Sequence, residues 1–313
     1  MGAVSAETRS TTEAAVKRHH GGATGFVPPA PALADFHTHT LRSDGVLTPA
    51  QLVTAAAAVG VRAMAITDHD TLAGVRELRA SGGVPDGLEV IPGIEINTVV
   101  VDRDHVLEGE VHILGIGVDP DDEALEAALA RQRDARRIRF EKMIGKLRDL
   151  GMSVDAALET LPATTDEDAL GRPRVARALI AAGYATSIED AFNRHLSRGR
   201  PAYVPREGLG PRDAIGAIRA AGGLASLAHY SEAVEHLDWI QELIEMGLNG
   251  LEVHYRAFDA ETVQRMRGIA TDYRLTWTGG TDFHGDGESY AEAHAQLWNP
   301  PEVLDGVRAA LER

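Results

Sequence analysis

Short apolar segments alternate with amphipathic segments along most of the chain. The apolar runs predict buried strands near 31–36, 61–67, 88–91, 111–118, 224–228, 250–254 and 275–279. Helical spacing follows most of them, and Thr48-Pro49 offers an N-cap and a first-turn proline to the first of these helices. Pro92-Gly93 is expected to end the third strand. Strands that alternate with helices indicate parallel pairing and an α/β fold, here a barrel.

The pattern changes between residues 120 and 208, where the strands stop. Helical periodicity there predicts helices near 121–150, 172–183 and 187–197. We therefore interpret 120–208 as an inserted helical cap subdomain and assign the barrel to 32–119 and 209–313. Residues 1–31 are rich in Ala, Thr, Ser and Gly, which is typical of a flexible tail.

Composition restricts the chemistry that the chain can perform. The 313 residues include no cysteine, which excludes disulfides and thiolate metal sites and favours a cytoplasmic location. Any metal must then be held by imidazole and carboxylate, a donor set that suits Mn, Fe or Zn. The net charge of −16 argues against long duplex nucleic acid as a partner, and no apolar stretch is long enough for a membrane span.

Candidate metal ligands stand at the ends of the predicted strands. His37 and His39 follow the first strand, and their spacing of two places both imidazoles on one face of an extended chain. Alone, this pair would equally fit surface histidines near a turn. Glu95 interrupts an apolar run, which is costly unless the carboxylate is paired or bound to metal. The other candidates at or near strand ends are Asp44, His69, His112, His229, Asp282 and His284. Parallel strands of a barrel bring such positions to one face, so the sequence predicts a metal site there.

The insertion carries 15 basic and 15 acidic residues, so the remainder of the chain holds the whole net charge. We interpret the basic residues in 131–148 as a solvated helix face. Two further groups, 172–174 and 198–203, lie beside Pro and Gly at predicted turns. Whether one of their arginines meets a substrate phosphate or serves only the turn stays open at this point.

The motifs together resemble the PHP (polymerase and histidinol phosphatase) superfamily of metal-dependent phosphoesterases. The resemblance rests on segments that occur in family order: 35–39 (DFHTH), 67–70 (TDHD), 92–95 (PGIE), 111–115 (VHILG), 228–229 (AH) and 280–284 (GTDFH). The insertion, with 171–173 (GRP) and 199–203 (GRPAY), is similar to the branch acting on nucleoside 3′,5′-bisphosphates and short RNA.

This resemblance implies a distorted (β/α)7 barrel with three divalent ions, Mn before Fe or Zn, bound by nine side chains. The implied ligands are His37, His39, Glu95 and Asp282 for the first ion, Glu95, His112 and His229 for the second, and Asp44, His69 and His284 for the third. It implies hydrolysis of a phosphate ester of a small nucleotide, or trimming of short RNA from its 5′ end, by a metal-bridging hydroxide. Glu95, His229 and Asp282 would be catalytic, and Arg172, Arg200 and Tyr203 would bind substrate.

Some positions depart from the family pattern or leave alternatives open. Tyr230 replaces a common proline after His229, and Arg174 replaces a histidine, which puts in doubt any substrate role of that position. Asp68 would orient a ligand imidazole rather than bind metal. His254 would contact either substrate or the core. Histidinol-phosphate phosphatase and a non-catalytic accessory module remain alternative functions, and the sequence leaves the oligomeric state open.

Overall fold

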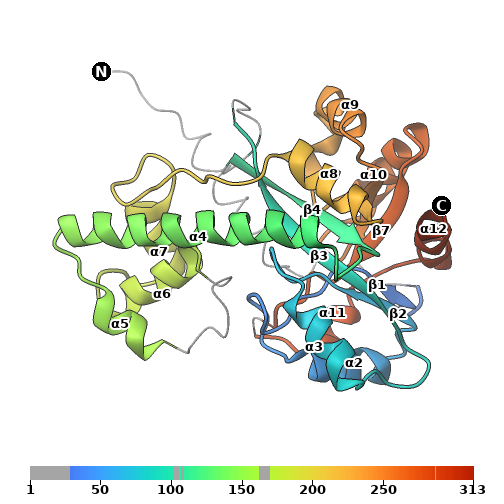
Figure 1. The fold of residues 1–313 in the computed structure, drawn as a ribbon, viewed down its shortest axis with the longest axis horizontal. Coiled ribbons are helices and arrows are strands. Elements are labelled where there is room, and N and C mark those ends of the chain that lie inside the picture. The colour runs from blue at the N-terminus through green and yellow to red at the C-terminus, as the bar shows by residue number, and fades with distance from the viewer. Residues whose placement is uncertain (1–28, 102–105, 107–108, 162–169, 286) are drawn as a thin grey trace.

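The computed structural model describes residues 29–101, 106, 109–161, 170–285 and 287–313. Seven strands form one sheet in the order β1-β2-β3-β4-β5-β6-β7, which curves into a nearly closed barrel (Figure 1). The strands are β1 Ala34–Asp35, β2 Ala63–Ile66, β3 Glu89–Val99, β4 Glu110–Ile116, β5 Leu224–Leu227, β6 Gly250–Tyr255 and β7 Thr276–Gly280. The predicted α/β barrel is confirmed.

The chain after β1 meets the end of β7 and draws the two edges of the sheet together. The amide of Phe36 donates to the carbonyl of Gly279 over 3.0 Å, and the amide of Asp282 donates to the carbonyl of His37 over 2.8 Å. A parallel bridge pairs Thr38 with Phe283. Residues close to both chain ends of the barrel are therefore held side by side.

Helices surround the barrel and one of them covers its base. In chain order they are α2 Pro49–Ala58, α3 Ala73–Ser81, α4 Glu123–Asp149, α5 Asp155–Thr160, α6 Arg172–Ala181, α7 Ile188–Ala191, a π-helical turn Phe192–Leu196, α8 Pro211–Ala220, a 3₁₀ turn Ser231–Val234, α9 Leu237–Glu245, α10 Ala260–Asp272, α11 Tyr290–His294 and α12 Pro301–Leu311. The predicted cap of the first helix is confirmed, because Thr48 and Gln51 form a reciprocal capping box before Pro49. Side chains of α12 pack against apolar residues from β1 to β5.

The expectation of parallel pairing throughout is wrong. β3 pairs antiparallel with β4, and β4 pairs antiparallel with β5, whereas the other neighbours are parallel. No predicted helix stood between 99 and 110, and a parallel connection needs a crossover of a dozen or more residues. β3 also continues through Pro92-Gly93, where it was expected to stop. Pro92 has no N–H to donate, but it keeps its place in the sheet, because it pairs with Ile66 of β2 and its carbonyl accepts from the amide of Gly117.

The helices of the insertion lie beside the barrel and share a hydrophobic cluster of their own. α4 extends from the barrel to the group formed by α5, α6 and α7 (Figure 1). The cluster includes Phe140, Leu147, Val175 and Leu179. The predicted helix 187–197 is α7 followed by the π-helical turn. The boundaries at 120 and 208 stay a prediction, and most of the predicted tail lies outside the described residues. Every described helix falls short of the length and apolar character that a membrane span requires.

Candidate metal centre

The candidate ligands arrive at one end of the barrel from six different strands. His37 and His39 follow β1, His69 follows β2, His229 follows β5, and Asp282 and His284 follow β7, while Glu95 lies within β3 and Asp44 in the loop before α2. His112 lies near the beginning of β4 rather than its end. Because β4 runs antiparallel to its neighbours, its beginning reaches the rim at which the parallel strands finish.

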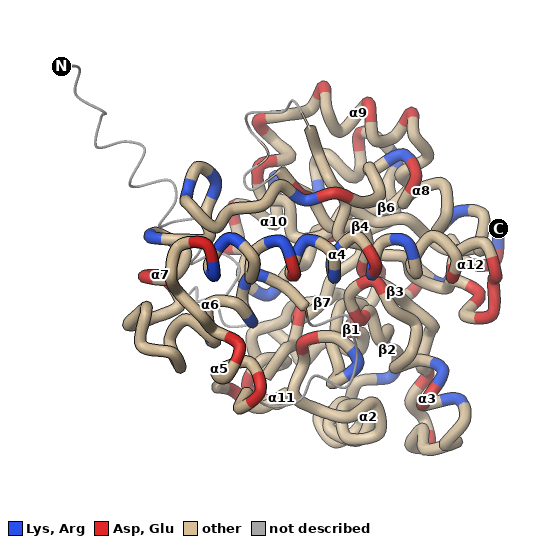
Figure 2. Tube along the Cα trace, turned by 60° about the vertical axis from the view of Figure 1, so that its left-hand side comes forward, with Lys and Arg blue, Asp and Glu red and all other residues tan. Residues whose placement is uncertain are grey.

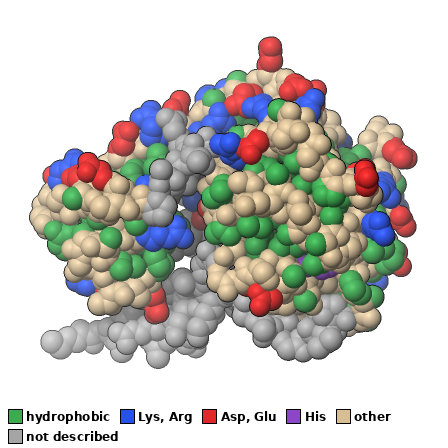
Figure 3. Space-filling model, turned by 90° about the horizontal axis from the view of Figure 1, so that it is seen from below, with side chains coloured by type: hydrophobic (Ala, Val, Ile, Leu, Met, Phe, Trp, Pro, Cys, Tyr) green, Lys and Arg blue, Asp and Glu red, His purple; other side chains and the backbone are tan. Residues whose placement is uncertain are grey.

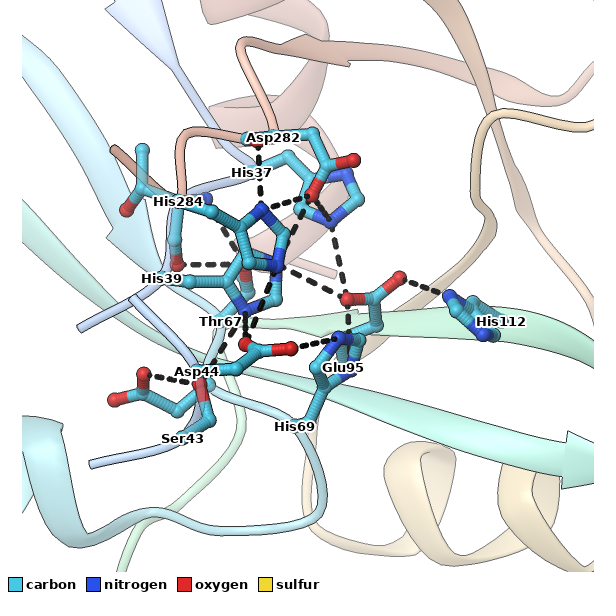
Figure 4. Close-up of polar contacts among 12 residues, drawn as sticks. His37, His39, Ser43, Asp44, Thr67, His69, Glu95, His112, Asp282 and His284 are labelled. Carbon is cyan, nitrogen blue, oxygen red and sulfur yellow. Dashed lines mark hydrogen bonds and ion pairs between the residues drawn. The ribbon is translucent and has the colours of Figure 1, made fainter. Parts of the chain in front are cut away.

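Four side chains enclose one point of this rim. The Nε2 atoms of His37 and His39 each lie 3.1–3.2 Å from Oε2 of Glu95 and from Oδ1 of Asp282. Ligand atoms placed tetrahedrally around an ion at 2.0–2.1 Å are about 3.3–3.4 Å apart, so the spacing fits one metal ion. Figure 4 shows the Glu95 carboxylate between these imidazoles and His112.

The burial of these atoms supports the same conclusion. His37, His39 and Glu95 are fully buried, yet Nε2 of both histidines and Oε2 of Glu95 have no hydrogen-bond partner among the described residues. A buried polar atom without a partner costs about 1–3 kcal/mol. A metal ion would satisfy all three atoms at once. Only a small area of histidine is visible on the face drawn in Figure 3.

Glu95 presents its other oxygen to a second group. Oε1 of Glu95 lies 2.8 Å from Nδ1 of His112 and 3.3 Å from Nε2 of His229. A third group forms around Asp44, whose oxygens lie 3.2 Å from His284 and 3.6 Å from His69. The structure therefore brings together all nine side chains that the sequence singled out as ligands.

Burial and charge act on these groups in opposite directions. Burial raises the pKa of the Glu95 carboxyl, but His69, His37 and His112 around it hold the pKa well below its usual value. Burial likewise opposes a charge on His284, yet Asp44 and Asp282 raise its pKa to about 10. Burial lowers the pKa of His69 to about 3, so that ring stays neutral. Without an ion, the cluster thus favours ionised carboxylates and a protonated His284, and a bound cation would replace that proton.

The backbone is strained where it delivers these ligands. Among described residues other than glycine, positive φ occurs at Asp70, His229, Arg274 and Asp282. Of these four, Asp70, His229 and Asp282 lie at the rim. Such conformations cost of order 1–3 kcal/mol each and concentrate at functional sites. The rim geometry is therefore maintained by the surrounding packing.

Two residues that the sequence analysis missed support the ligands. Glu252 of β6 is fully buried, accepts from Nδ1 of His37 over 3.1 Å and accepts from the backbone amide of His229 over 2.7 Å. Tyr255 donates to Oδ2 of Asp282 over 3.2 Å. The signal for Glu252 was present, since it is a carboxylate in an apolar strand, as is Glu95.

Asp68 supports the turn that contains Asp44 rather than contacting a metal-facing atom. Its carboxylate accepts from the amide and hydroxyl of Thr40, both over 2.7 Å, and from the hydroxyl of Ser43 over 2.8 Å. The Ser43 hydroxyl lies 3.5 Å from Nδ1 of His39. Asp68 thus reaches a ligand imidazole through Ser43.

The candidate substrate residues are more scattered. Arg172 is buried, lies 3.6 Å from Glu110 and covers the ring of Phe192, whereas Arg200 lies on an exposed turn. The backbone carbonyl of Tyr203 accepts from Lys146 of α4. The structure brings Arg172 to Glu110 of β4, which lies two residues before His112 in the chain. It does not place Arg200 beside Arg172.

The interpretation of 131–148 as a solvated helix face is wrong for part of α4. Lys and Arg follow one another along this helix in Figure 2, but they face different surroundings. Arg136 pairs with the buried Asp70, and Arg133 donates to the Asp70 carbonyl over 3.0 Å. Arg139 is buried and donates to the carbonyl of Val204. Charge periodicity alone did not indicate which face of α4 meets the barrel.

His254 lies apart from the ligand cluster. Its ring is buried against Trp298 and Trp277, at centroid distances of 5.3 and 6.3 Å. A register shift in β6 between Glu252 and His254 accompanies this change of surroundings. The placement favours packing over contact with a substrate at the metal centre.

Comparison with known proteins identifies the family of this chain. A model of the PHP domain matches residues 35–256. The chain belongs to the PHP domain family. It is 32% identical over 87% of its length to the 5′-3′ exoribonuclease Rnm of Escherichia coli, covering 92% of that protein. It is 31% identical to the 3′,5′-nucleoside bisphosphate phosphatase of Chromobacterium violaceum, over 81% of this chain and 88% of that one.

A solved PHP-like structure supports the fold and the enzyme class. A crystal structure from Bifidobacterium adolescentis, provisionally assigned as a metal-dependent phosphoesterase, superimposes with a TM-score of 0.72 and 31% identity, covering 90% of this chain and 97% of that one. The predicted class, a metal-dependent phosphoesterase, is confirmed at that level.

Proposed function

We propose that this PHP phosphoesterase hydrolyses a phosphate ester of a small nucleotide, with three divalent ions, preferably Mn²⁺, in the candidate metal centre. The substrate would be a nucleoside 3′,5′-bisphosphate, giving a nucleoside monophosphate, or the 5′ end of a short RNA. The single observation that carries the proposal is the set of buried ligand atoms that converge on Glu95 at the spacing of a metal site and that no hydrogen bond satisfies. The names of the two curated relatives support the nucleotide class.

The proposed ligand sets follow the three groups of the rim. His37, His39, Glu95 and Asp282 would hold one ion, His112, His229 and Glu95 a second, and Asp44, His69 and His284 a third. Glu95 would bridge two ions, since its two oxygens face different histidines. Bound divalent ions would supply Lewis-acid stabilisation of the charge that develops on the phosphate. The chain's own contribution is to orient the imidazoles, which Glu252 does for His37 by accepting from its Nδ1.

Arginines around Glu110 suit a second phosphate that is not hydrolysed. Arg172 and Arg206 both approach the Glu110 carboxylate, and together they lower its pKa to about 2 against the effect of burial. Burial, Arg206 and Arg172 lower the pKa of Arg139 to about 10. Arg172 and Arg206 thus share one carboxylate on β4, close enough to Arg139 to act on its pKa, and an anion there would relieve the mutual repulsion of the three guanidinium groups.

Of the arginines expected to bind substrate, Arg172 remains a candidate for the second-phosphate contact. Arg206 takes the place of Arg200. Such a contact would be equally strong in the ground state and the transition state. Its loss should therefore raise KM more than it lowers kcat.

The first experiment compares substrates and metals. Adenosine 3′,5′-bisphosphate, a short 5′-phosphorylated RNA and histidinol phosphate are assayed in parallel with metal-loaded enzyme, then after chelation, then with Mn²⁺ restored. We expect turnover of a nucleotide substrate that vanishes with chelator and returns with Mn²⁺. Preference for histidinol phosphate would favour the alternative enzyme, and absence of turnover on all three would favour an accessory role.

The second experiment tests the arginines. Arg172→Ala and Arg206→Ala should raise KM for the bisphosphate at least about tenfold, because a charge-assisted hydrogen bond contributes roughly 1.5–3 kcal/mol, and should affect a simple phosphomonoester much less. Arg137→Ala is the matched control, since Arg137 lies on the outer face of α4 and pairs with Glu141. Equal losses on both substrates would contradict the second-phosphate role. The cytoplasmic location stays a prediction.

A further inference from the structure

A cavity of about 370 Å³ lies between the end of β6 and helix α10, and none of its lining residues is a candidate metal ligand. We call it the β6–α10 cavity. One stripe of α10 forms a wall, with Ala260, Val263, Gln264 and Arg267 at helical spacing. The volume is at the small end of ligand sites, which run from roughly 300 to 1,000 Å³. It therefore suits a molecule of mononucleotide size rather than an oligonucleotide.

Aromatic rings form the apolar part of the cavity. Tyr255, Phe258 and Trp298 all line it. Tyr255 and Phe258 meet edge to face at a centroid distance of 5.2 Å, and both are buried. Trp298 is only partly buried, so part of its surface is available to a ligand. Flat aromatic walls of this kind favour a planar ring system.

The polar part of the cavity is cationic. The lining residues include Arg256 and Arg267 but no carboxylate, on a protein with 47 acidic and 31 basic residues. In the described part of the chain, no carboxylate forms an ion pair with Arg267, whose guanidinium lies 4.7 Å above the ring of Trp277. Glu288, outside the lining, neutralises Arg256, so Arg267 provides the charge complementarity for an anion.

Two residues that line this cavity carry buried nitrogen atoms without a well-formed hydrogen bond. Nε of Arg256 is buried and has no hydrogen-bond acceptor among the described residues, although the same guanidinium pairs with Glu288. The imidazole of His254 is 2% exposed, and neither ring nitrogen makes a well-formed hydrogen bond to a described group, although one of them faces the main chain of Trp298. These nitrogen atoms lie behind the cavity surface, so the accessible polar side chains that line the cavity are Gln264, Arg267 and Gln296.

We propose that the β6–α10 cavity is a second binding site, separate from the metal centre, for a nucleoside monophosphate. The base would stack on Trp298, and the phosphate would meet Arg267. The proposal does not depend on which ester the metal centre hydrolyses.

Tryptophan fluorescence can report binding at this site. Of the chain's three tryptophans, Trp277 and Trp298 flank His254, whereas Trp239 packs in the core against Tyr230. The metal-loaded protein is titrated with AMP, adenosine and inorganic phosphate while tryptophan fluorescence is recorded, and AMP binding is measured in parallel by equilibrium dialysis. We expect saturable quenching by AMP, and at least tenfold weaker binding of adenosine and of phosphate.

Variants separate the cavity from the metal centre. Arg267→Ala should weaken the AMP-dependent quenching at least tenfold, and Arg267→Lys should weaken it less. Arg265→Ala is the control, because it removes the same side chain from the same helix but from an exposed pair with Glu235. Trp298→Phe should remove most of the signal while dialysis still detects AMP. The proposal is overturned if Arg267→Ala and wild type quench alike, if adenosine binds as tightly as AMP, or if no saturable signal occurs up to millimolar AMP.

Discussion

Glu252→Gln tests whether a buried carboxylate outside the ligand set controls metal binding. Glu252 accepts from Nδ1 of His37 with one oxygen and from the backbone amide of His229 with the other. With Nδ1 donating to Glu252, the lone pair of His37 Nε2 points at Glu95 and Asp282. The variant keeps the size of the side chain and removes one of its two acceptors.

Either orientation of the new amide harms the site. If its NH₂ faces His37, the imidazole must accept at Nδ1 and carry its proton on Nε2, which blocks the metal-facing atom. If its NH₂ faces His229 instead, two donors meet and a buried backbone amide loses its acceptor. Each outcome costs about 1–3 kcal/mol, which corresponds to roughly 5- to 150-fold in affinity. This agrees with the 10- to 100-fold typical of groups that orient metal ligands.

The assay is a Mn²⁺ titration of stripped protein by calorimetry, with turnover measured at low and high Mn²⁺. We expect weaker Mn²⁺ binding by 10- to 100-fold and partial recovery of turnover at high Mn²⁺. Glu89→Gln is the control, because the same chemical change occurs there in an exposed pair with Arg308. Unchanged Mn²⁺ affinity together with a lowered melting temperature would refute the argument and leave Glu252 a purely structural role.

Three further predictions concern the fold and the ligands. Glu95→Gln should lower bound metal and remove most turnover with an unchanged circular dichroism spectrum; full metal content with full turnover would contradict the bridging role. Gly280→Ala should destabilise the fold by about 1–3 kcal/mol in denaturant unfolding, because a Cβ there would lie 2.4 Å from Cβ of His37, whereas Gly216→Ala in α8 meets no atom within 4 Å and should not destabilise. Glu110→Gln should cost at most about 3 kcal/mol at pH 7, since the folded pKa of about 2 lies below the usual 4.5. That contribution is complete above pH 4.5 and is lost as the pH falls towards 2, so the difference between variant and wild type should shrink by pH 3; a constant difference would contradict it.

The sequence by itself determined the ligand chemistry and most of the elements. His37, His39 and Glu95 were recognisable because local spacing and an apolar context report directly on strand ends and burial. The absence of cysteine limited the donor set without any structure. These features are local, so a single chain is enough to read them.

Only the tertiary structure decided the features that depend on partners distant in sequence. The reversed strand β4 places His112 at the rim, and the pattern of strands had indicated parallel pairing instead. Glu252 acquires its role from His37, which is 215 residues away in the chain. The inward face of α4 became identifiable only when Arg136 met Asp70. Periodicity predicts whether a side chain is buried or solvated. It does not predict which group that side chain contacts, because the contact depends on how distant elements pack together.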